Sequence, residues 1–158
     1  MNPSNPWEST TVIEHSVRLA ENYRRWTGRE LLPGGDLQNP REFAARLSAA
    51  PFVIVSHGNE ADPVLNYGNR VALDLWEMSW EQLTATPSRF TAEAPNREER
   101  ARLLAQVTQH GFIDNYAGIR ISRTGRRFRI SRATVWNILD AASVYRGQAA
   151  TFAAWEFL

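Results

Sequence analysis

The sequence predicts an α+β fold, with a five-stranded antiparallel sheet, a helical insert covering one face of it, and N-terminal helices before it. Three patterns lead to this prediction. Residues 11–27 and 40–50 show the apolar spacing of helices, and residues 52–56 and 64–67 are two short β-rich runs. Short helical segments follow, and from residue 113 onwards three runs alternate polar and apolar residues. Two early strands and three late strands pair most simply into one sheet.

The composition is that of one globular domain. The chain has 158 residues, of which 43% are hydrophobic and 22% charged, with six Trp, seven Phe and four Tyr. A net charge of +1 provides no overall field that would attract nucleic acid or a membrane surface. The absence of Cys excludes disulfides, thiolate metal sites and a Cys nucleophile. We expect a cytoplasmic protein, because no secretion signal and no apolar stretch of roughly 20 residues is present.

An amphipathic helix is expected after a loose lead-in. Thr11 and Glu14 form a capping-box pair at its start, and Gly28 is expected to end it. The chain divides on this basis into residues 1–39, the lead-in and helix, and residues 40–158, the sheet domain. The apolar stripe of the helix suits either a second subunit, giving a homodimer, or the chain's own sheet. The candidate interface residues are Val12, Leu19, Tyr23 and Trp26.

Turn and cap residues divide the rest of the chain. Pro51 closes the second helix, and residues 57–63 form the turn between the two early strands. The late strands are expected at 113–121, 128–138 and 145–155, separated by turns at 124–125 and 140–143. The expected helix caps are Asn39, Asn69, Ser79 with Gln82, and Asn96 with Glu99, and Gly111 is expected to end the last helix of the insert.

This order of elements and several local motifs resemble those of PAS domains. Leu65 to Trp76 is similar to the PAS segment in which a strand ending in Tyr leads to an Asn-capped helix. More narrowly, the sequence resembles the MEKHLA domain, a PAS-related family, over about residues 40–155. The motifs that carry this resemblance are His57-Gly58, Ala61 to Pro63, Leu65 to Asn69, Pro87 to Glu93, Asn96-Arg97, Gly111 to Tyr116 and Tyr145 to Ala150. The resemblance implies a sensory or regulatory role without an established ligand or reaction.

Two PAS cofactors can be weighed against these residues. Ser88 stands where flavin photosensors carry the adduct-forming Cys, and Arg129-Ile130 replaces the aromatic and Asn pair that flavin binders show. A thiol adduct with flavin is therefore excluded. His110 is the only His in the helical insert, and its position before Gly111 indicates a helix C-cap role and not a haem ligand. The cofactor, if there is one, stays unknown.

Polar residues on the apolar side of the late strands are the first candidates for ligand contacts. Asn115 lies in phase with Ile113 and Ile119, where it bonds either a ligand or a neighbouring loop. Arg132 lies in phase with apolar neighbours as well, so it either faces an anion or is turned outwards by a β-bulge. Trp136 is either a cavity wall or plain core. The full candidate set is Asn66, Tyr67, Asn115, Arg132, Trp136, Asn137 and Gln148.

Other chemistries have weaker support. His57, Glu60 and Asp62 are adjacent turn residues, so no metal site is predicted. The Arg residues between 120 and 129 are expected mostly on the outer strand face and the hairpin tip, without the interleaved aromatics that stack bases. No catalytic motif appears, so no catalytic residue and no enzyme are predicted.

Three functional hypotheses follow from these patterns. The first is a small stand-alone sensory or regulatory module that binds a ligand or a protein partner and signals by association. The second is a pure interaction or dimerisation module without a ligand. The third is a small enzyme or carrier of the NTF2-like kind, which would need paired His and acidic residues in a deep pocket.

Overall fold

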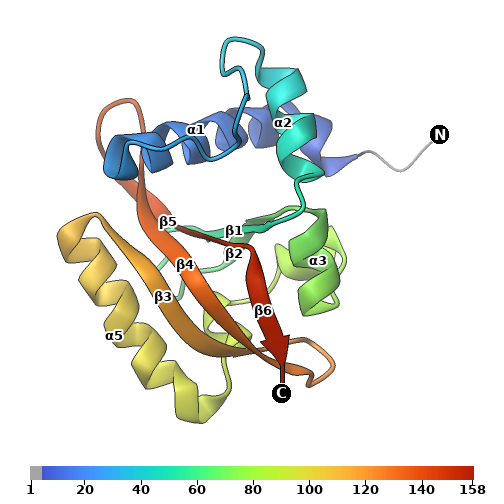
Figure 1. The fold of residues 1–158 in the computed structure, drawn as a ribbon, viewed down its shortest axis with the longest axis vertical. Helices are drawn as coiled ribbons and strands as arrows, with labels where there is room; N and C mark the ends of the chain where they lie inside the picture. The colour runs from blue at the N-terminus through green and yellow to red at the C-terminus, as the bar shows by residue number, and fades with distance from the viewer. Residues whose placement is uncertain (1–4) are drawn as a thin grey trace.

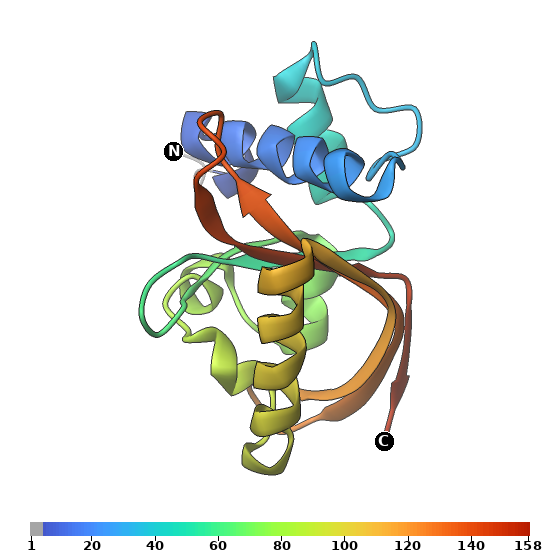
Figure 2. The same cartoon turned by 90° about the vertical axis from the view of Figure 1, so that its left-hand side faces the viewer.

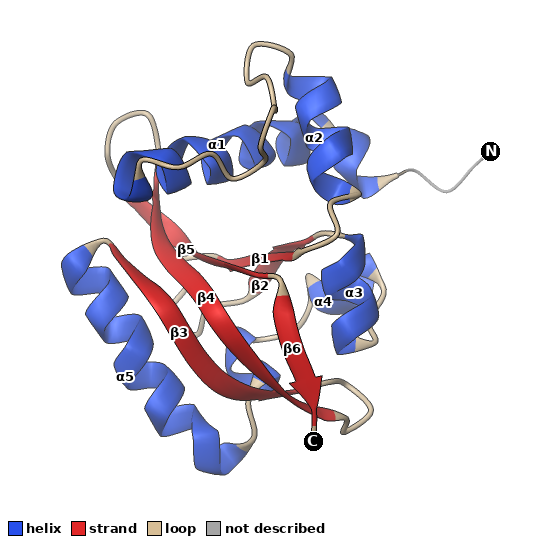
Figure 3. Ribbon diagram, in the orientation of Figure 1, coloured by secondary structure: helices blue, strands red, loops and turns tan. Residues whose placement is uncertain are grey.

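The computed structural model describes residues 5–158 and forms one α+β unit around a curved antiparallel sheet (Figure 1, Figure 3). Residues 1–4, the first part of the predicted lead-in, lie outside the described range. The strand order is β2-β1-β5-β4-β3, and β6 pairs with β4. The strands are β1 (Val53–His57), β2 (Leu65–Gly68), β3 (Phe112–Ile121), β4 (Arg127–Leu139), β5 (Tyr145–Phe152) and β6 (Ala154–Phe157). The predicted pairing of the early and late strands is confirmed, because β1 pairs with β5.

The predicted last strand, 145–155, is in fact two strands. β5 pairs with β1 on one side and with the second half of β4 on the other, while β6 pairs with the first half of β4. The register continues unchanged across the gap, from Thr134 opposite Thr151 to Ser131 opposite Ala154. The break at Ala153 therefore lies opposite Arg132, where β4 bulges and the ladder is interrupted.

The helices begin and end near the predicted residues. They are η1 (Pro6–Glu8), α1 (Thr10–Thr27), α2 (Pro40–Ser48), α3 (Arg70–Trp76), α4 (Trp80–Leu83), η2 (Ser88–Thr91) and α5 (Ala94–His110). Asn69 and Ser79 cap α3 and α4 as predicted, and Ser79 completes a capping box with Gln82. The predicted start of α1 is wrong, because Ser9 and not Thr11 accepts the first free N–H group, that of Val12. The start of α5 is wrong as well, because Glu93 takes the cap position and Pro95 occupies the first turn ahead of Asn96.

The sheet separates two cores (Figure 2). In that view the N-terminal helices, blue to cyan, cover one side of the strands, and the insert, green to gold, covers the other. We call the first the α1-side core; its buried members include Leu19, Tyr23, Leu47, Tyr67 and Trp136. We call the second the insert-side core; its buried members include Trp76, Leu103, Phe128, Val135 and Phe152. Both cores are rich in aromatic side chains, which supply most of the apolar burial that stabilises so small a domain.

Two β-bulges change which side chains face the insert. In β3 the four residues from Ile113 to Tyr116 oppose three residues of β4, and in β4 the four residues from Ile130 to Ala133 oppose three residues of β3. The extra residues, Asn115 and Arg132, have φ values of 55° and 53°. Because side chains alternate along a strand, each bulge moves all later residues to the opposite face.

The bulge in β4 separates side chains that were predicted to share a face. Phe128 and Ile130 lie in the insert-side core, whereas Trp136 and Ile138 lie in the α1-side core. In β3 the bulge turns Tyr116 and Arg120 inwards, whereas the alternation of the sequence predicts that Ala117 and Ile119 face inwards. These shifts decide which polar residues reach the interior.

Candidate functional site

A cavity of about 60 Å³ lies between the insert-side face of the sheet and the helices of the insert. Strands β1, β3, β4 and β5 and helix α5 contribute to its wall, together with Trp76 at the end of α3. Most of the lining is apolar. Its polar and aromatic lining includes His57, Trp76, Arg100, Tyr116, Arg120 and Gln148.

Arg120 reaches this cavity from β3 and is only 6% exposed. Its guanidinium donates to the carbonyl oxygen of Ile119 at 2.9 Å and to the hydroxyl oxygen of Tyr116 at 3.0 Å. The Tyr116 hydroxyl donates in turn to the carboxylate of Glu99 on α5 at 2.9 Å. Arg120 is therefore linked to an acid only through Tyr116, which leaves its charge weakly compensated.

Gly118 makes room for this arrangement. It lies between Tyr116 and Arg120 on the same side of β3, and a Cβ atom at this position would collide with the Tyr116 hydroxyl and press on the Arg120 guanidinium. Any larger residue at position 118 would displace one of the two polar groups. Because Gly118 has no side chain, Tyr116 and Arg120 can both lie against the cavity.

Arg100 extends from the middle of α5 towards the same cavity. Within residues 5–158 it makes neither an ion pair nor a side-chain hydrogen bond. Burial, and after it the neighbouring charge of Arg120, lower the pKa of Arg100 to about 10. Two guanidinium groups without a direct acidic partner therefore lie beside one largely apolar cavity.

His57 ends β1 and lines the cavity while being only 6% exposed. Its Nδ1 lies 2.9 Å from the carbonyl oxygen of Gly58, which can only accept, so Nδ1 carries the proton. Burial lowers the pKa of His57, and the charge of Arg100 acts in the same direction, so the ring is neutral near pH 7. Its Nε2 is then an acceptor that lies near the Gln148 side chain, and no group within the described residues bonds it.

Trp76 and Gln148 complete the polar lining. The indole Nε1 of Trp76 is buried and has no hydrogen-bond partner in the part of the chain that the structure describes. Gln148 uses its amide nitrogen for the carbonyl of Leu104 at 3.0 Å, the Thr108 hydroxyl at 3.0 Å and the Asn137 side-chain oxygen at 3.1 Å. It ties β5 to α5 as well as lining the cavity. An unbonded buried donor or acceptor costs about 1–3 kcal/mol, so His57 and Trp76 are expensive to keep.

The predicted ligand residues divide between several places. Only Gln148 lines this cavity. Asn137 is buried behind it and donates to the carbonyl oxygen of Val107 at 2.9 Å, an internal role. Trp136 and Tyr67 lie in the α1-side core, and Asn66 is exposed and accepts a hydrogen bond from Ser56.

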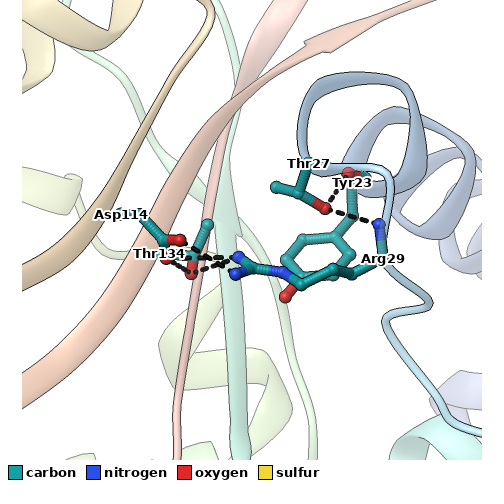
Figure 4. Close-up of polar contacts among 5 residues, drawn as sticks. All are labelled: Tyr23, Thr27, Arg29, Asp114 and Thr134. Atoms are coloured by element: carbon teal, nitrogen blue, oxygen red, sulfur yellow. Dashed lines mark hydrogen bonds and ion pairs between the residues drawn. The ribbon is translucent and has the colours of Figure 1, made fainter.

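The expectation that Asn115 and Arg132 are buried is wrong. Both side chains are exposed at the two bulges, and for Arg132 this is the outward turn by a β-bulge that the sequence left open. They line a surface hollow near the end of α1. Figure 4 shows that Arg29, which follows α1, reaches across to Asp114 at 2.9 Å, while Thr134 donates to Asp114 at 2.6 Å. These contacts fasten the end of α1 to β3 and β4.

The candidate interface stripe packs on the chain's own sheet. Leu19 and Tyr23 are buried in the α1-side core, and Val12 and Trp26 pack against that core. Trp26 also donates to the carbonyl oxygen of Asn137 at 2.9 Å. The structure thus realises the second alternative left open by the sequence, with Leu19 and Tyr23 buried and Val12 and Trp26 partly buried.

Arg120, Arg100 and Trp76 are the residues that sequence reasoning missed. Arg120 was assigned to the outer strand face because the β3 bulge was not foreseen. The glycine at position 118 between Tyr116 and Arg120 is the sequence signal that would have pointed to a crowded, polar strand face. Arg100 lies on a helix with little amphipathic contrast, so its direction could not be predicted from spacing.

Among residues 5–158, no helix is both long and apolar enough to cross a membrane. No group of three or more His, Asp and Glu side chains in that range is arranged to hold a metal ion, and Asp62 instead pairs with Arg89 at 3.1 Å.

The fold and the cavity define a PAS-type module. The PAS domain of a protein from Colwellia psychrerythraea superposes with a TM-score of 0.62 at 14% identity, over 78% of this chain and 98% of that chain. The chain belongs to the MEKHLA domain family, since the model of that family matches residues 13–157. The match begins inside α1, so it takes in the helix that covers the outer face of the sheet.

Other relatives are more distant or longer. The homeobox-leucine zipper protein ATHB-9 of Arabidopsis thaliana is 29% identical over 98 residues, which is 62% of this chain but only 12% of that protein. A light-oxygen-voltage domain studied with a flavin analogue has a TM-score of 0.56 at 12% identity, over 74% of this chain and 84% of its own. The fungal blue-light photoreceptor Vivid, in its light-state dimer, has a TM-score of 0.52 at 12% identity, over 65% of this chain and 76% of that chain.

The flavin of light-oxygen-voltage domains does not fit these residues. The cavity of about 60 Å³ is far smaller than the roughly 300–1,000 Å³ typical of ligand pockets, and two arginines occupy its margin. The chain has no Cys for an adduct, and Ser88, at the position of that Cys, is buried.

Proposed function

We propose that this chain is a sensory module that takes up a small polar molecule in the cavity between the sheet and α5. The observation that carries the proposal is the convergence of polar groups on one cavity. His57 Nε2 and the indole of Trp76 are buried without partners among residues 5–158, and the partly exposed guanidinium of Arg100 lies beside them. Proteins rarely leave buried polar groups without partners, and a bound molecule would supply them. The proposed role is binding and not catalysis.

The elements around the cavity suggest how occupancy would be transmitted. Arg100 and Glu99 lie on α5, and Arg120 and Tyr116 lie on β3, so a ligand that bonds these groups would draw α5 and β3 together. Strand β4, next to β3, carries Trp136, which packs on Tyr23 of α1 with ring centroids 5.0 Å apart. A change in the cavity would therefore reach α1 through one strand.

Native mass spectrometry of the purified protein, followed by denaturation, tests this proposal. A small molecule that stays bound in the native spectrum and is released on unfolding supports it. Retention should fall in an Arg100→Gln variant and persist in Arg102→Gln, since Arg102 lies exposed on the same helix and pairs with Glu98. A native spectrum of the bare chain, together with no stabilisation by any added metabolite, would contradict the sensory assignment.

Association as a homodimer, or with a regulatory protein, is the proposed route for the signal. The related Vivid photoreceptor was captured as a light-state dimer, which supports self-association in this fold. An interaction module without any ligand is the second candidate. Sedimentation of the protein before and after ligand removal separates them, because a sensor changes its association with occupancy, whereas an interaction module stays dimeric without a ligand.

A further inference from the structure

The charges around the cavity indicate which class of molecule it takes. Arg100 and Arg120 line it together, and within residues 5–158 neither forms an ion pair. The nearby acids are already engaged: Glu99 accepts from the Tyr116 hydroxyl, and Glu60 accepts from the backbone of Val64. The cavity therefore offers guanidinium donors that the protein itself does not neutralise.

A carboxylate is the natural complement of such donors. Its two oxygens accept parallel hydrogen bonds from one guanidinium, a geometry that a neutral amide or alcohol does not match. Placing the partly exposed Arg100 beside the buried Arg120 is unfavourable without an anion, because the low dielectric around them strengthens their repulsion. An anion bound between Arg100 and Arg120 would remove both penalties at once.

His57 adds a second requirement. Its Nδ1–H group donates to the Gly58 carbonyl, so its Nε2 can only accept. No group of residues 5–158 bonds this Nε2, and His57 lines the cavity. A carboxylate has no proton to give at neutral pH, so the ligand needs a donor besides its acid group. A hydroxyl group provides that donor, and its oxygen can also accept from the Trp76 indole.

The volume of the cavity limits the size of the ligand. A water molecule takes about 30 Å³ in the liquid, so a cavity of about 60 Å³ has room for only a few heavy atoms. We propose that the cavity binds a small 2-hydroxycarboxylate, with the carboxylate on Arg100 and Arg120 and the hydroxyl on His57. This inference rests on the proposed sensory function and names the ligand class of that same site.

Titration calorimetry with three probes of nearly equal size tests the inference. Glycolate carries both groups, acetate lacks the hydroxyl, and glycolamide lacks the charge. Glycolate should bind at least about tenfold more tightly than either of the other two. The Arg100→Gln variant should lose that affinity by a similar factor, and Arg102→Gln, on the same helix, should keep it. A His57→Phe variant should bind glycolate and acetate equally, because it keeps the ring volume and loses Nε2.

The outcomes separate the ligand class from the sensory function. If glycolamide binds as tightly as glycolate, or if Arg100→Gln binds glycolate as well as the wild type, the carboxylate assignment is wrong while the cavity remains a ligand site. If no probe binds but native mass spectrometry releases another molecule, the ligand class is again wrong and the sensory function stands. If no probe binds and nothing is released, both the ligand class and the sensory function are wrong. Circular dichroism of each variant establishes that it is folded.

Discussion

The two faces of the sheet bury unbonded polar atoms in different surroundings. Among residues 5–158, the Tyr67 hydroxyl and the Trp136 indole lack partners on the α1 side, and His57 Nε2 and the Trp76 indole lack them on the insert side. Tyr67 and Trp136 lie among aromatic rings, with centroids 5.9 Å from Trp80 and 5.0 Å from Tyr23. His57 and Trp76 instead line a cavity that two arginines share. An unbonded buried atom marks a binding site only where there is space and charge beside it.

The comparison assigns stability to one face and binding to the other. The α1-side core joins α1, α2 and the sheet through large buried side chains, so its substitutions should mainly change the free energy of unfolding. The insert side retains groups that are costly without a ligand, so its substitutions should mainly change binding.

Trp136→Ala should lower the free energy of unfolding by about 3–5 kcal/mol, because it removes a fully buried ring from the α1-side core. Chemical denaturation of the variant and the wild type measures the loss. The fraction of the variant that stays folded should still bind glycolate at the cavity on the opposite face of the sheet. A loss below about 1 kcal/mol would contradict the assignment of this face to stability.

Lowering the pH should destabilise the α1 side through His15, whose pKa burial lowers to about 4. Since the folded pKa lies below the unfolded value, the unfolded state binds the proton more readily between pH 6.5 and 4. His15 should therefore cost about 2–3 kcal/mol of stability as the pH falls through that range. Urea titrations at pH 7 and pH 4.5 should show a smaller loss for His15→Gln, and an equal loss in both proteins would refute this origin.

Gly118→Ala should weaken glycolate binding and cost about 1–2 kcal/mol of stability, since the new methyl group meets the Tyr116 hydroxyl and Arg120. Calorimetry and thermal denaturation of the same variant measure the two effects. Gly125→Ala serves as the control, because its Cβ meets no atom within 4 Å, although its φ of 95° adds backbone strain. Unchanged binding in Gly118→Ala would show that this glycine does not hold the two polar groups in place.

Arg100→Met should stabilise the ligand-free protein by about 1 kcal/mol while abolishing glycolate binding, because it replaces a partly buried cation that has no ion-pair partner in residues 5–158 with a shorter apolar chain. Thermal denaturation with and without glycolate measures both effects. A destabilised variant that still responds to glycolate would reverse the division between the two faces.

Arg29→Ala should have the smallest effect, a loss of about 0.5–1 kcal/mol, because its ion pair with Asp114 is half exposed. The release of α1 should show as faster amide hydrogen exchange near residues 23–29. Exchange that does not change would indicate that the α1-side core alone holds the helix.

Much of the fold could be predicted from local patterns. Caps such as Asn69 and Ser79, the turn at Gly125 and the pairing of early with late strands depend on a few neighbouring residues. The candidate site could not be predicted in the same way. It depends on the bulges at Asn115 and Arg132, and a bulge leaves little trace in the sequence while reversing every later side chain. Asn115 and Arg132 were therefore expected inside, and Arg120 outside.

The indole N–H signals of Trp76 and Trp136 in a ¹⁵N-edited NMR spectrum report separately on the two faces of the sheet. Both groups are buried without partners in the described part of the chain, one on each face, and Trp→Phe variants assign their signals. Added glycolate should shift the Trp76 signal in a saturable way and leave the Trp136 signal nearly in place. A titration that moves the Trp136 signal and not that of Trp76 would contradict the account.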